Sequence, residues 1–163
     1  MSVEDEDLKI AESIRSWMVS HKQTLSTAES CTSGRIAATL TSVSGSSDYY
    51  QGGLVVYQNW MKQRYLDVDP ETIREHDVVS EEVVRQMVMG CLRQFGTDWA
   101  ICSTGYTDGG SDKVASGTIW IGYGQTDDIR TCCINSIGTR EENTALAART
   151  AVEMLCDMIS YII

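Results

Sequence analysis

Apolar side chains recur along this chain at two spacings, one typical of helices and the other of buried strands. Three- and four-residue spacing predicts helices over residues 5–22, 32–43, 59–68, 70–76, 80–96 and 139–163. Short apolar runs rich in β-branched residues predict strands over residues 24–29, 51–58, 98–105, 118–124 and 129–137. The last two strands are expected to form a hairpin around residues 125–128, and the continuous run at 51–58 predicts burial on both faces.

Polar residues between these runs mark where the helices begin and end. Ser80 and the two acids after it predict an N-cap, and Gly96 predicts the end of that helix. Thr32 or Ser33 is the expected N-cap of the second helix, and Pro70 suits a first helical turn. Because helices separate the early strands, we expect an α/β fold of three layers, α/β/α, with a mixed sheet and a single domain over residues 1–163.

Composition and charge narrow the classes of function. The chain has 163 residues, 42% of them hydrophobic, and a formal charge of −10 that disfavours nucleic acid and anionic membrane surfaces as partners. No apolar run is long enough to span a bilayer. The opening residues, MSVEDEDLKI, are acidic and lack the apolar stretch of a signal peptide, so a cytoplasmic setting is expected.

The cysteines and histidines do not predict a metal site. None of the six cysteines forms a C-x-x-C pair, and only two histidines, far apart in the sequence, are available. Most of the cysteines sit inside apolar runs, which predicts reduced, buried thiols. We therefore expect neither a metal nor a cofactor.

Three strand ends carry side chains suited to chemistry. The segments are AESCTSG, VYQNWMK and STGYTDGG. Ligands in open α/β sheets bind beyond the carboxyl ends of the strands, so these segments predict one shared crevice.

Seven segments in register resemble the C-terminal domain of the competence-damage-inducible CinA family. They are TAESCTSG, SGSSDYY, VVYQNWMK, VVSEEV, CSTGYTDGG, SGTIWIG and IGTREE, and they span nearly everything from about residue 8 onward. Active members of the family are nicotinamide-nucleotide amidases. The resemblance implies hydrolysis of nicotinamide mononucleotide to nicotinate mononucleotide and ammonia without a metal, by subunits that form homodimers or larger homo-oligomers.

The resemblance also implies the site. Carried over by motif, the nucleophile is Ser30, its base is Lys62 and an assisting hydroxyl comes from Tyr57. The expected substrate-binding residues are Glu29, Thr32, Ser33, Gly34, Thr104, Gly105 and Arg140, with Glu29 directed at Lys62 or a ribose hydroxyl and Arg140 at the phosphate.

The chemistry of the residues is compatible with these roles. An amide is a poor electrophile, so an attacking serine needs a base and a donor for the developing oxyanion. Of the four lysines, Lys62 alone directly follows a buried strand, and it must be neutral to accept a proton. A helix start near Ser30 would offer free N–H groups to an oxyanion or a phosphate. Cys31 stays open as a rival nucleophile.

Several positions depart from the family pattern. Ser33 stands where a glycine is usual and Asn143 where an arginine is common, and the glycine-rich loop at 105–117 is shorter, with Tyr106 and Asp108 replacing its usual residues. Acids at Asp108 and 112 disfavour a nearby phosphate. A second hypothesis therefore stays open, a non-catalytic paralogue that serves as a binding or interaction module. A nicotinamide-dependent reductase is excluded, since neither Y-x-x-x-K nor G-x-G-x-x-G occurs.

Overall fold

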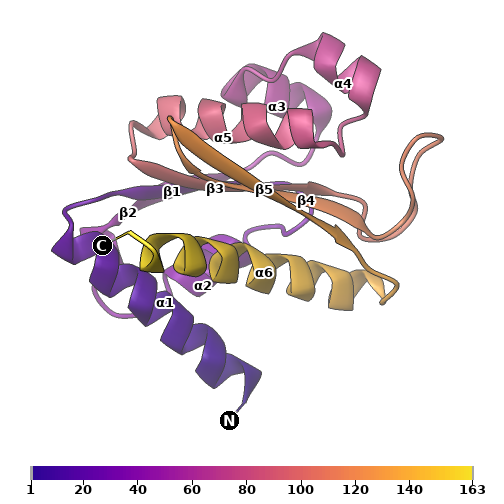
Figure 1. Ribbon diagram of the computed structural model, residues 1–163. Coiled ribbons are helices and arrows are strands. Elements are labelled where there is room, and N and C mark those ends of the chain that lie inside the picture. Colours follow the sequence, from indigo (N-terminus) through magenta and orange to yellow (C-terminus); the bar gives the residue numbers. More distant parts are fainter. Residues whose placement is uncertain (1, 163) are drawn as a thin grey trace.

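A five-stranded sheet forms the middle layer of the protein, which we describe over residues 2–162 from a computed structural model (Figure 1). Its strands are β1 (Leu25–Glu29), β2 (Tyr50–Val55), β3 (Trp99–Gly105), β4 (Thr118–Gln125) and β5 (Asp128–Asn135). They lie in the order β2-β1-β3-β4-β5; the first three are parallel, while β4 and β5 run antiparallel. The mixed sheet predicted from the sequence is confirmed.

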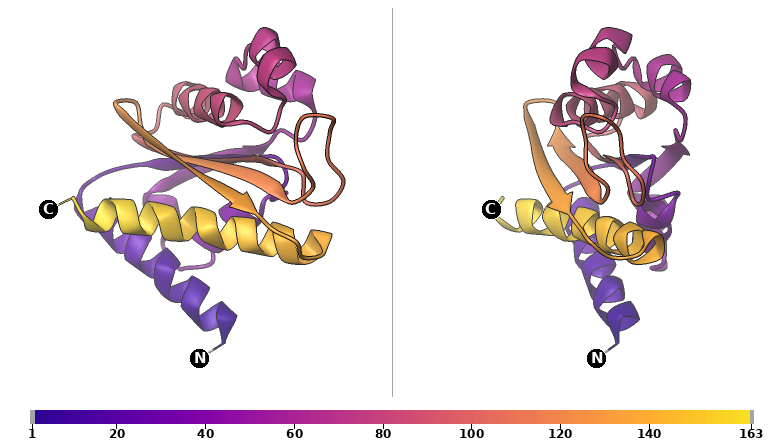
Figure 2. Two further views of the ribbon diagram at one scale, coloured as in Figure 1. Left: turned by 45° about the vertical axis from the view of Figure 1, so that its right-hand side comes forward. Right: turned by 90° about the vertical axis from the view of Figure 1, so that its right-hand side faces the viewer.

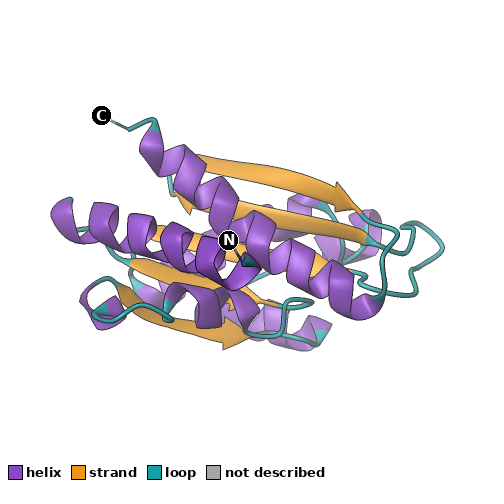
Figure 3. Cartoon of the chain, turned by 90° about the horizontal axis from the view of Figure 1, so that it is seen from below, coloured by secondary structure: helices purple, strands orange, loops and turns teal. Residues whose placement is uncertain are grey.

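Helices cover both faces of this sheet, which confirms the three layers (Figures 1 and 3). One face is covered by α1 (Val3–Ser20), α2 (Arg35–Leu40) and α6 (Arg140–Ser160). The opposite face is covered by α3 (Asn59–Leu66), α4 (Pro70–His76) and α5 (Glu81–Phe95), and a short 3₁₀ turn, η1 (Ser46–Asp48), precedes β2. None of the helices in the described range is long and apolar enough to cross a membrane.

The central strand β3 contributes side chains to two apolar cores, because successive side chains of a strand point to opposite faces of the sheet. Ile101 packs into the core shared with α1, α2 and α6, whereas Ala100 and Cys102 pack into the core shared with α3 and α5. All three side chains are fully buried. This double burial explains why the residues of β3 read as a continuous apolar run.

The predicted helix ends of α5 are confirmed. The Ser80 hydroxyl accepts a hydrogen bond from the N–H of Val83, and Gly96 ends the helix in the left-handed conformation. Within α5, Gly90 allows α3 to pack closely, since a Cβ there would lie 2.0 Å from the carbonyl oxygen of Leu66.

Two expectations about the edge of the sheet and the second helix are wrong. β2 is an edge strand, so its side chains alternate between half-buried and exposed instead of being buried on both faces. α2 begins only at Arg35, and its N-cap is Gly34, in the left-handed region with φ +94°, rather than Thr32 or Ser33. The preceding residues form a tight turn, in which Ser33 also has a positive φ of +54°.

Smaller differences concern chain ends and cysteines. The last helix ends at Ser160, and the final residue of its predicted range, Ile163, lies outside the described residues. The β4–β5 turn is two residues long, because β4 reaches Gln125 and β5 starts at Asp128. Only half of the cysteines are buried, although all are free thiols; the half-buried ones are Cys132, Cys133 and Cys156.

Candidate active site

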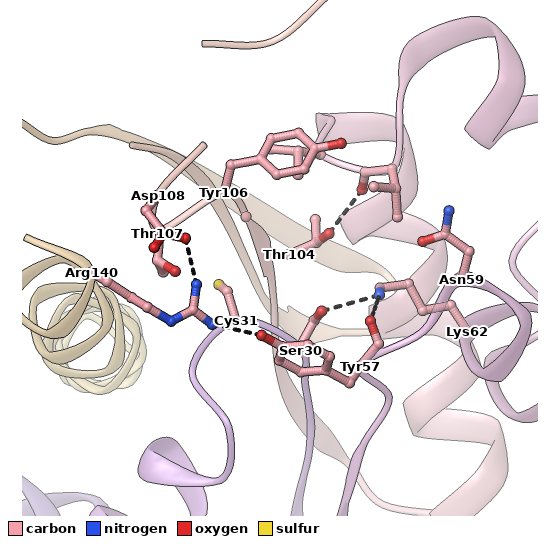
Figure 4. Close-up of a pocket in the computed structure, with 13 residues that line it drawn as sticks. Ser30, Cys31, Tyr57, Asn59, Lys62, Thr104, Tyr106, Thr107, Asp108 and Arg140 are labelled. Atoms are coloured by element: carbon pink, nitrogen blue, oxygen red, sulfur yellow. Dashed lines mark hydrogen bonds and ion pairs between the residues drawn. The ribbon is translucent and has the colours of Figure 1, made fainter. Parts of the chain in front are cut away.

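A pocket of about 270 Å³ opens beyond the carboxyl ends of the parallel strands (Figure 4). Its walls come from the end of β1, the segment that joins β2 to α3, the start of the β3–β4 loop and the first residue of α6. Six of the ten residues predicted as catalytic or substrate-binding line it: Ser30, Tyr57, Lys62, Thr104, Gly105 and Arg140. The topology therefore brings together side chains that are up to 110 positions apart in the chain.

The centre of the pocket is a direct contact between Lys62 and Ser30. The Nζ of Lys62 lies 3.1 Å from the Oγ of Ser30 and 3.3 Å from the backbone carbonyl oxygen of Tyr57. Lys62 is only 1% exposed, although it is charged in water, and Ser30 is 7% exposed. The backbone of Ser30 is fixed in turn, because its N–H donates to the carbonyl oxygen of Ser103 on β3 at 3.2 Å.

Burial gives this lysine an unusual protonation equilibrium. Desolvation lowers the pKa of Lys62 from 10.5 to about 8, against a smaller opposing influence of Cys31. About a tenth of the molecules would then carry a neutral amine at pH 7. A neutral amine within hydrogen-bond distance of a hydroxyl can accept its proton, which is the requirement for activating a serine.

Cys31 also faces the pocket but differs from Ser30 in its environment. Burial raises the pKa of the Cys31 thiol to about 11, although a hydrogen bond to Ser103 opposes this shift. The nearby Glu29 carboxylate raises it further. Since the thiolate is the reactive form of cysteine, this environment disfavours Cys31 as a nucleophile near neutral pH.

A chain of polar contacts crosses the opposite wall (Figure 4). Arg140, the first residue of α6, donates from Nη1 to Asp108 at 2.5 Å and from Nη2 to the hydroxyl of Tyr57 at 2.7 Å. Tyr57 is 48% exposed. Because its oxygen accepts from Arg140, the phenol keeps its own hydrogen for donation into the pocket.

Glu29 and Thr32 are placed differently from our expectation. Glu29 is 1% exposed, and its two carboxylate oxygens accept from the N–H groups of Ile36 and Ala37 at 2.9 and 3.0 Å and from the hydroxyl of Thr32 at 2.6 Å. The carboxylate therefore caps the first turn of α2. It does not contact Lys62, and it occupies N–H groups that we expected to be free for an oxyanion or a phosphate.

Thr32, Ser33 and Gly34 likewise lie outside the pocket wall. Thr32 is fully buried against Glu29 and the hydroxyl of Ser103, whereas Ser33 lines an adjoining hollow that also includes Arg140. Gly34 caps α2. These residues form the turn that follows Ser30, and their predicted part in substrate binding stays a prediction.

The β3–β4 loop, residues 106–117, is tied to the α4–α5 side of the sheet (Figure 2). The carboxylate of Asp77 accepts from the hydroxyls of Tyr106 and Ser111 at 3.0 and 2.6 Å. Lys113 donates to the carbonyl oxygens of Arg74 and Glu75, in the last turn of α4, at 2.8 and 3.2 Å. The hydroxyl of Thr104, near the end of β3, donates to the carbonyl oxygen of Val78 at 2.8 Å.

The same loop is fixed to the other helical layer by Asn143. Its Nδ2 donates to the carbonyl oxygens of Thr107 and Gly138 at 2.7 and 3.0 Å, and the side chain is 2% exposed. Asn143 therefore anchors the loop to α6. Further wall residues were not assigned to the site from the sequence; they are Asn59, Val78, Val79 and Thr107.

Some of these unassigned residues lie within the family motifs and could have been predicted from them. Asn59 lies within VVYQNWMK, and Val78 and Val79 open VVSEEV. Neither of the two histidines lines the pocket, so a serine–histidine pair is not formed there. Within residues 2–162, no three His, Cys, Asp or Glu side chains converge as a metal site would require.

Comparison with known proteins identifies the family of this chain. The profile of the CinA C-terminal domain family matches residues 7–159. The CinA-like protein of Cytophaga hutchinsonii is 37% identical over 82% of this chain, and that of Rippkaea orientalis is 34% identical over 92% of it. This chain spans only about a third of their length, 32% and 37% respectively.

Two solved structures resemble this one closely. The competence damage-inducible protein A of Klebsiella pneumoniae is 30% identical with a TM-score of 0.91, over 95% of this chain and 98% of that one. A CinA superfamily protein of Escherichia coli is 27% identical with a TM-score of 0.91, over 97% and 93% of the two chains.

Proposed function

This chain belongs to the family of CinA C-terminal domains, and on that premise we propose that it is a nicotinamide-nucleotide amidase. The reaction is hydrolysis of the carboxamide of nicotinamide mononucleotide to nicotinate mononucleotide and ammonia. The observation that carries this proposal is the buried Lys62 amine, 3.1 Å from the hydroxyl of Ser30 in a pocket at the strand ends.

In the first step, the Oγ of Ser30 attacks the carboxamide carbon while the neutral Nζ of Lys62 takes the hydroxyl proton. The tetrahedral intermediate then collapses. Its C–N bond breaks, and the proton held by Lys62 passes to the departing nitrogen, so ammonia leaves and an ester to Ser30 remains.

In the second step, water attacks this ester. Lys62 again takes a proton, now from the water, and returns it to Oγ as the ester bond breaks; the carboxylic acid so formed gives its remaining proton to ammonia. The sum is one amide and one water consumed for one carboxylate and one ammonium ion.

Two hydroxyls suit the two ends of the carboxamide. The free hydrogen of Tyr57 can donate to the developing oxyanion. Thr104 already donates to Val78, so its oxygen is left to accept from the carboxamide NH₂ group. The pair thus offers one hydroxyl to the carbonyl oxygen of the carboxamide and one to its NH₂ group.

A second candidate function is a non-catalytic binding module. It is favoured by the Asp108–Arg140 pair, which occupies the arginine expected to bind phosphate. The retained contact between Lys62 and Ser30 favours the amidase instead, since a binding module has no need of a buried amine. The homo-oligomer, the cytoplasmic setting and the single domain stay predictions.

The test is ammonia release from nicotinamide mononucleotide by the purified protein. We expect release by the wild type, loss of at least about 10³-fold in Ser30→Ala and Lys62→Ala, and no change in Lys22→Ala, a matched exposed lysine outside the pocket. Absence of release by the wild type would exclude this activity, and release that survives both pocket substitutions would exclude the mechanism.

A further inference from the structure

Both terminal nitrogens of Arg140 are already in use within the pocket (Figure 4). One pairs with the carboxylate of Asp108 at 2.5 Å, and the other donates to Tyr57 at 2.7 Å. A guanidinium recognises a phosphate best when two of its N–H groups face the phosphate oxygens together. A substrate phosphate that approached these two N–H groups would therefore compete for them with the Asp108 carboxylate and the Tyr57 hydroxyl.

Asp108 is held where it would oppose such a phosphate. The residue before it, Thr107, is 3% exposed, and its carbonyl oxygen accepts from Asn143 on α6. This contact fixes the backbone beside the first turn of α6. If a phosphate displaced the Asp108 carboxylate from Arg140, the carboxylate would remain next to the doubly charged phosphate, and the two negative groups would repel each other.

The other charges around the pocket do not offset this repulsion. Once Lys62 is neutral, as its role as a base requires, Arg140 and Asp108 are the charged residues that remain in the wall. The adjoining hollow adds Arg35 but also Glu141. The charge of the whole chain is −10, so its long-range field does not attract an anion.

We propose that Asp108 sets substrate selectivity by holding Arg140, so that the phosphate contributes little and the site takes the nucleoside, nicotinamide riboside, about as readily as the mononucleotide. This rests on the amidase function proposed above. Asp108 acts through Arg140 and is a positioning residue. Its replacement changes the choice between two substrates that share one reacting group.

The experiment compares kcat/KM for ammonia release from the mononucleotide and from the riboside, in the wild type, Asp108→Asn and Asp112→Asn. Asp112 is an exposed acid of the same loop that lies outside the pocket wall, so it is the matched control. The ratio of the two kcat/KM values cancels any effect on the shared chemistry. Thermal unfolding confirms that each variant is folded.

We expect a nucleotide-to-nucleoside ratio below about 10 in the wild type, and a rise of at least about threefold in Asp108→Asn, mainly through a lower KM for the nucleotide. The ratio in Asp112→Asn stays at the wild-type value. A wild-type ratio above 10, a smaller rise in Asp108→Asn, or an equal rise in Asp112→Asn overturns the role of Asp108.

Failure of the amidase function is distinguishable from failure of this selectivity. If neither amide releases ammonia, calorimetric titration with ribose 5-phosphate tests Arg140 directly. Asp108→Asn should then bind ribose 5-phosphate at least about threefold more tightly than the wild type. Equal affinity overturns the role of Asp108 whatever reaction the site performs.

Discussion

The amine of Lys62 and the hydroxyl of Ser30 lie 3.1 Å apart, although the two residues belong to different elements and are 32 positions apart in the sequence. Ser30 follows β1 directly, and Lys62 lies in α3, where it is buried against the sheet. The contact exists because the parallel strands β1 and β2 end at the same edge.

The first prediction separates Ser30 from its neighbour Cys31. Ser30→Ala should lower kcat/KM for amide hydrolysis by at least about 10³-fold, whereas Cys31→Ala should stay within about tenfold of the wild type. The reason is that Ser30 contacts Lys62 while burial keeps Cys31 in its thiol form. The reverse order of the two losses would identify Cys31 as the nucleophile.

The second prediction concerns pH. Because the required form of Lys62 is the neutral amine and its pKa is about 8, kcat/KM should rise about tenfold per pH unit below 8 and level off above it. The measurement is the pH profile of kcat/KM, which reports the free enzyme. A profile that falls as pH rises through 8 would show that the ammonium form is the active one.

The third prediction is that Lys62→Met stabilises the fold while abolishing activity. An ammonium buried to this extent is costly, so its removal should raise the free energy of unfolding by roughly 1–3 kcal/mol at pH 7. The folded pKa of about 8 lies below the ordinary 10.5, so the unfolded chain binds more protons between these values. Wild-type stability should therefore rise with pH across that window.

Denaturant titrations at pH 7 and pH 10 check this. The advantage of the methionine variant should shrink as the lysine loses its charge. An advantage that is equal at both pH values, or a variant less stable than the wild type at pH 7, contradicts a destabilising ammonium at position 62.

The fourth prediction tests the cap on α2. In Glu29→Gln, an amide nitrogen replaces one carboxylate oxygen and faces an N–H donor, which should lower the free energy of unfolding by roughly 1–3 kcal/mol. Glu12→Gln, at an exposed ion pair with Arg15, should change it by less than about 1 kcal/mol. Comparable losses in both variants would mean that the Glu29 contacts contribute nothing particular to stability.

Local patterns were sufficient to predict much of this structure. The stripe in α5, its N-cap at Ser80 and its end at Gly96 depend on neighbours in the sequence, and the structure agrees with all three. Ser30 and Lys62 were predicted as site residues because a family motif contains each of them, and both line the pocket. Both kinds of information are carried by a few consecutive residues.

The remaining features depend on contacts between distant parts of the chain. The exposure of β2 follows from its place at the sheet edge, which no residue of β2 reveals. The cap on α2 comes from Glu29, whose acceptors bind N–H groups seven and eight positions away across a tight turn. Asp108 and Arg140 are separated by the rest of the β3–β4 loop and by the β4–β5 hairpin, so their pairing depends on how both of these fold.

Under the proposed amidase function, the anchoring of the β3–β4 loop places the selection of the substrate on a different wall from the Ser30–Lys62 pair. The reacting pair is built by β1, β3 and α3, whereas the far wall is carried by the loop and the first turn of α6. Ser111 and Asn143 attach that wall to the scaffold without touching the pair. Grafted loops that keep these two attachments, and with them the contact between Arg140 and Tyr57, should therefore retarget the site to new amides while the Ser30–Lys62 pair stays in place.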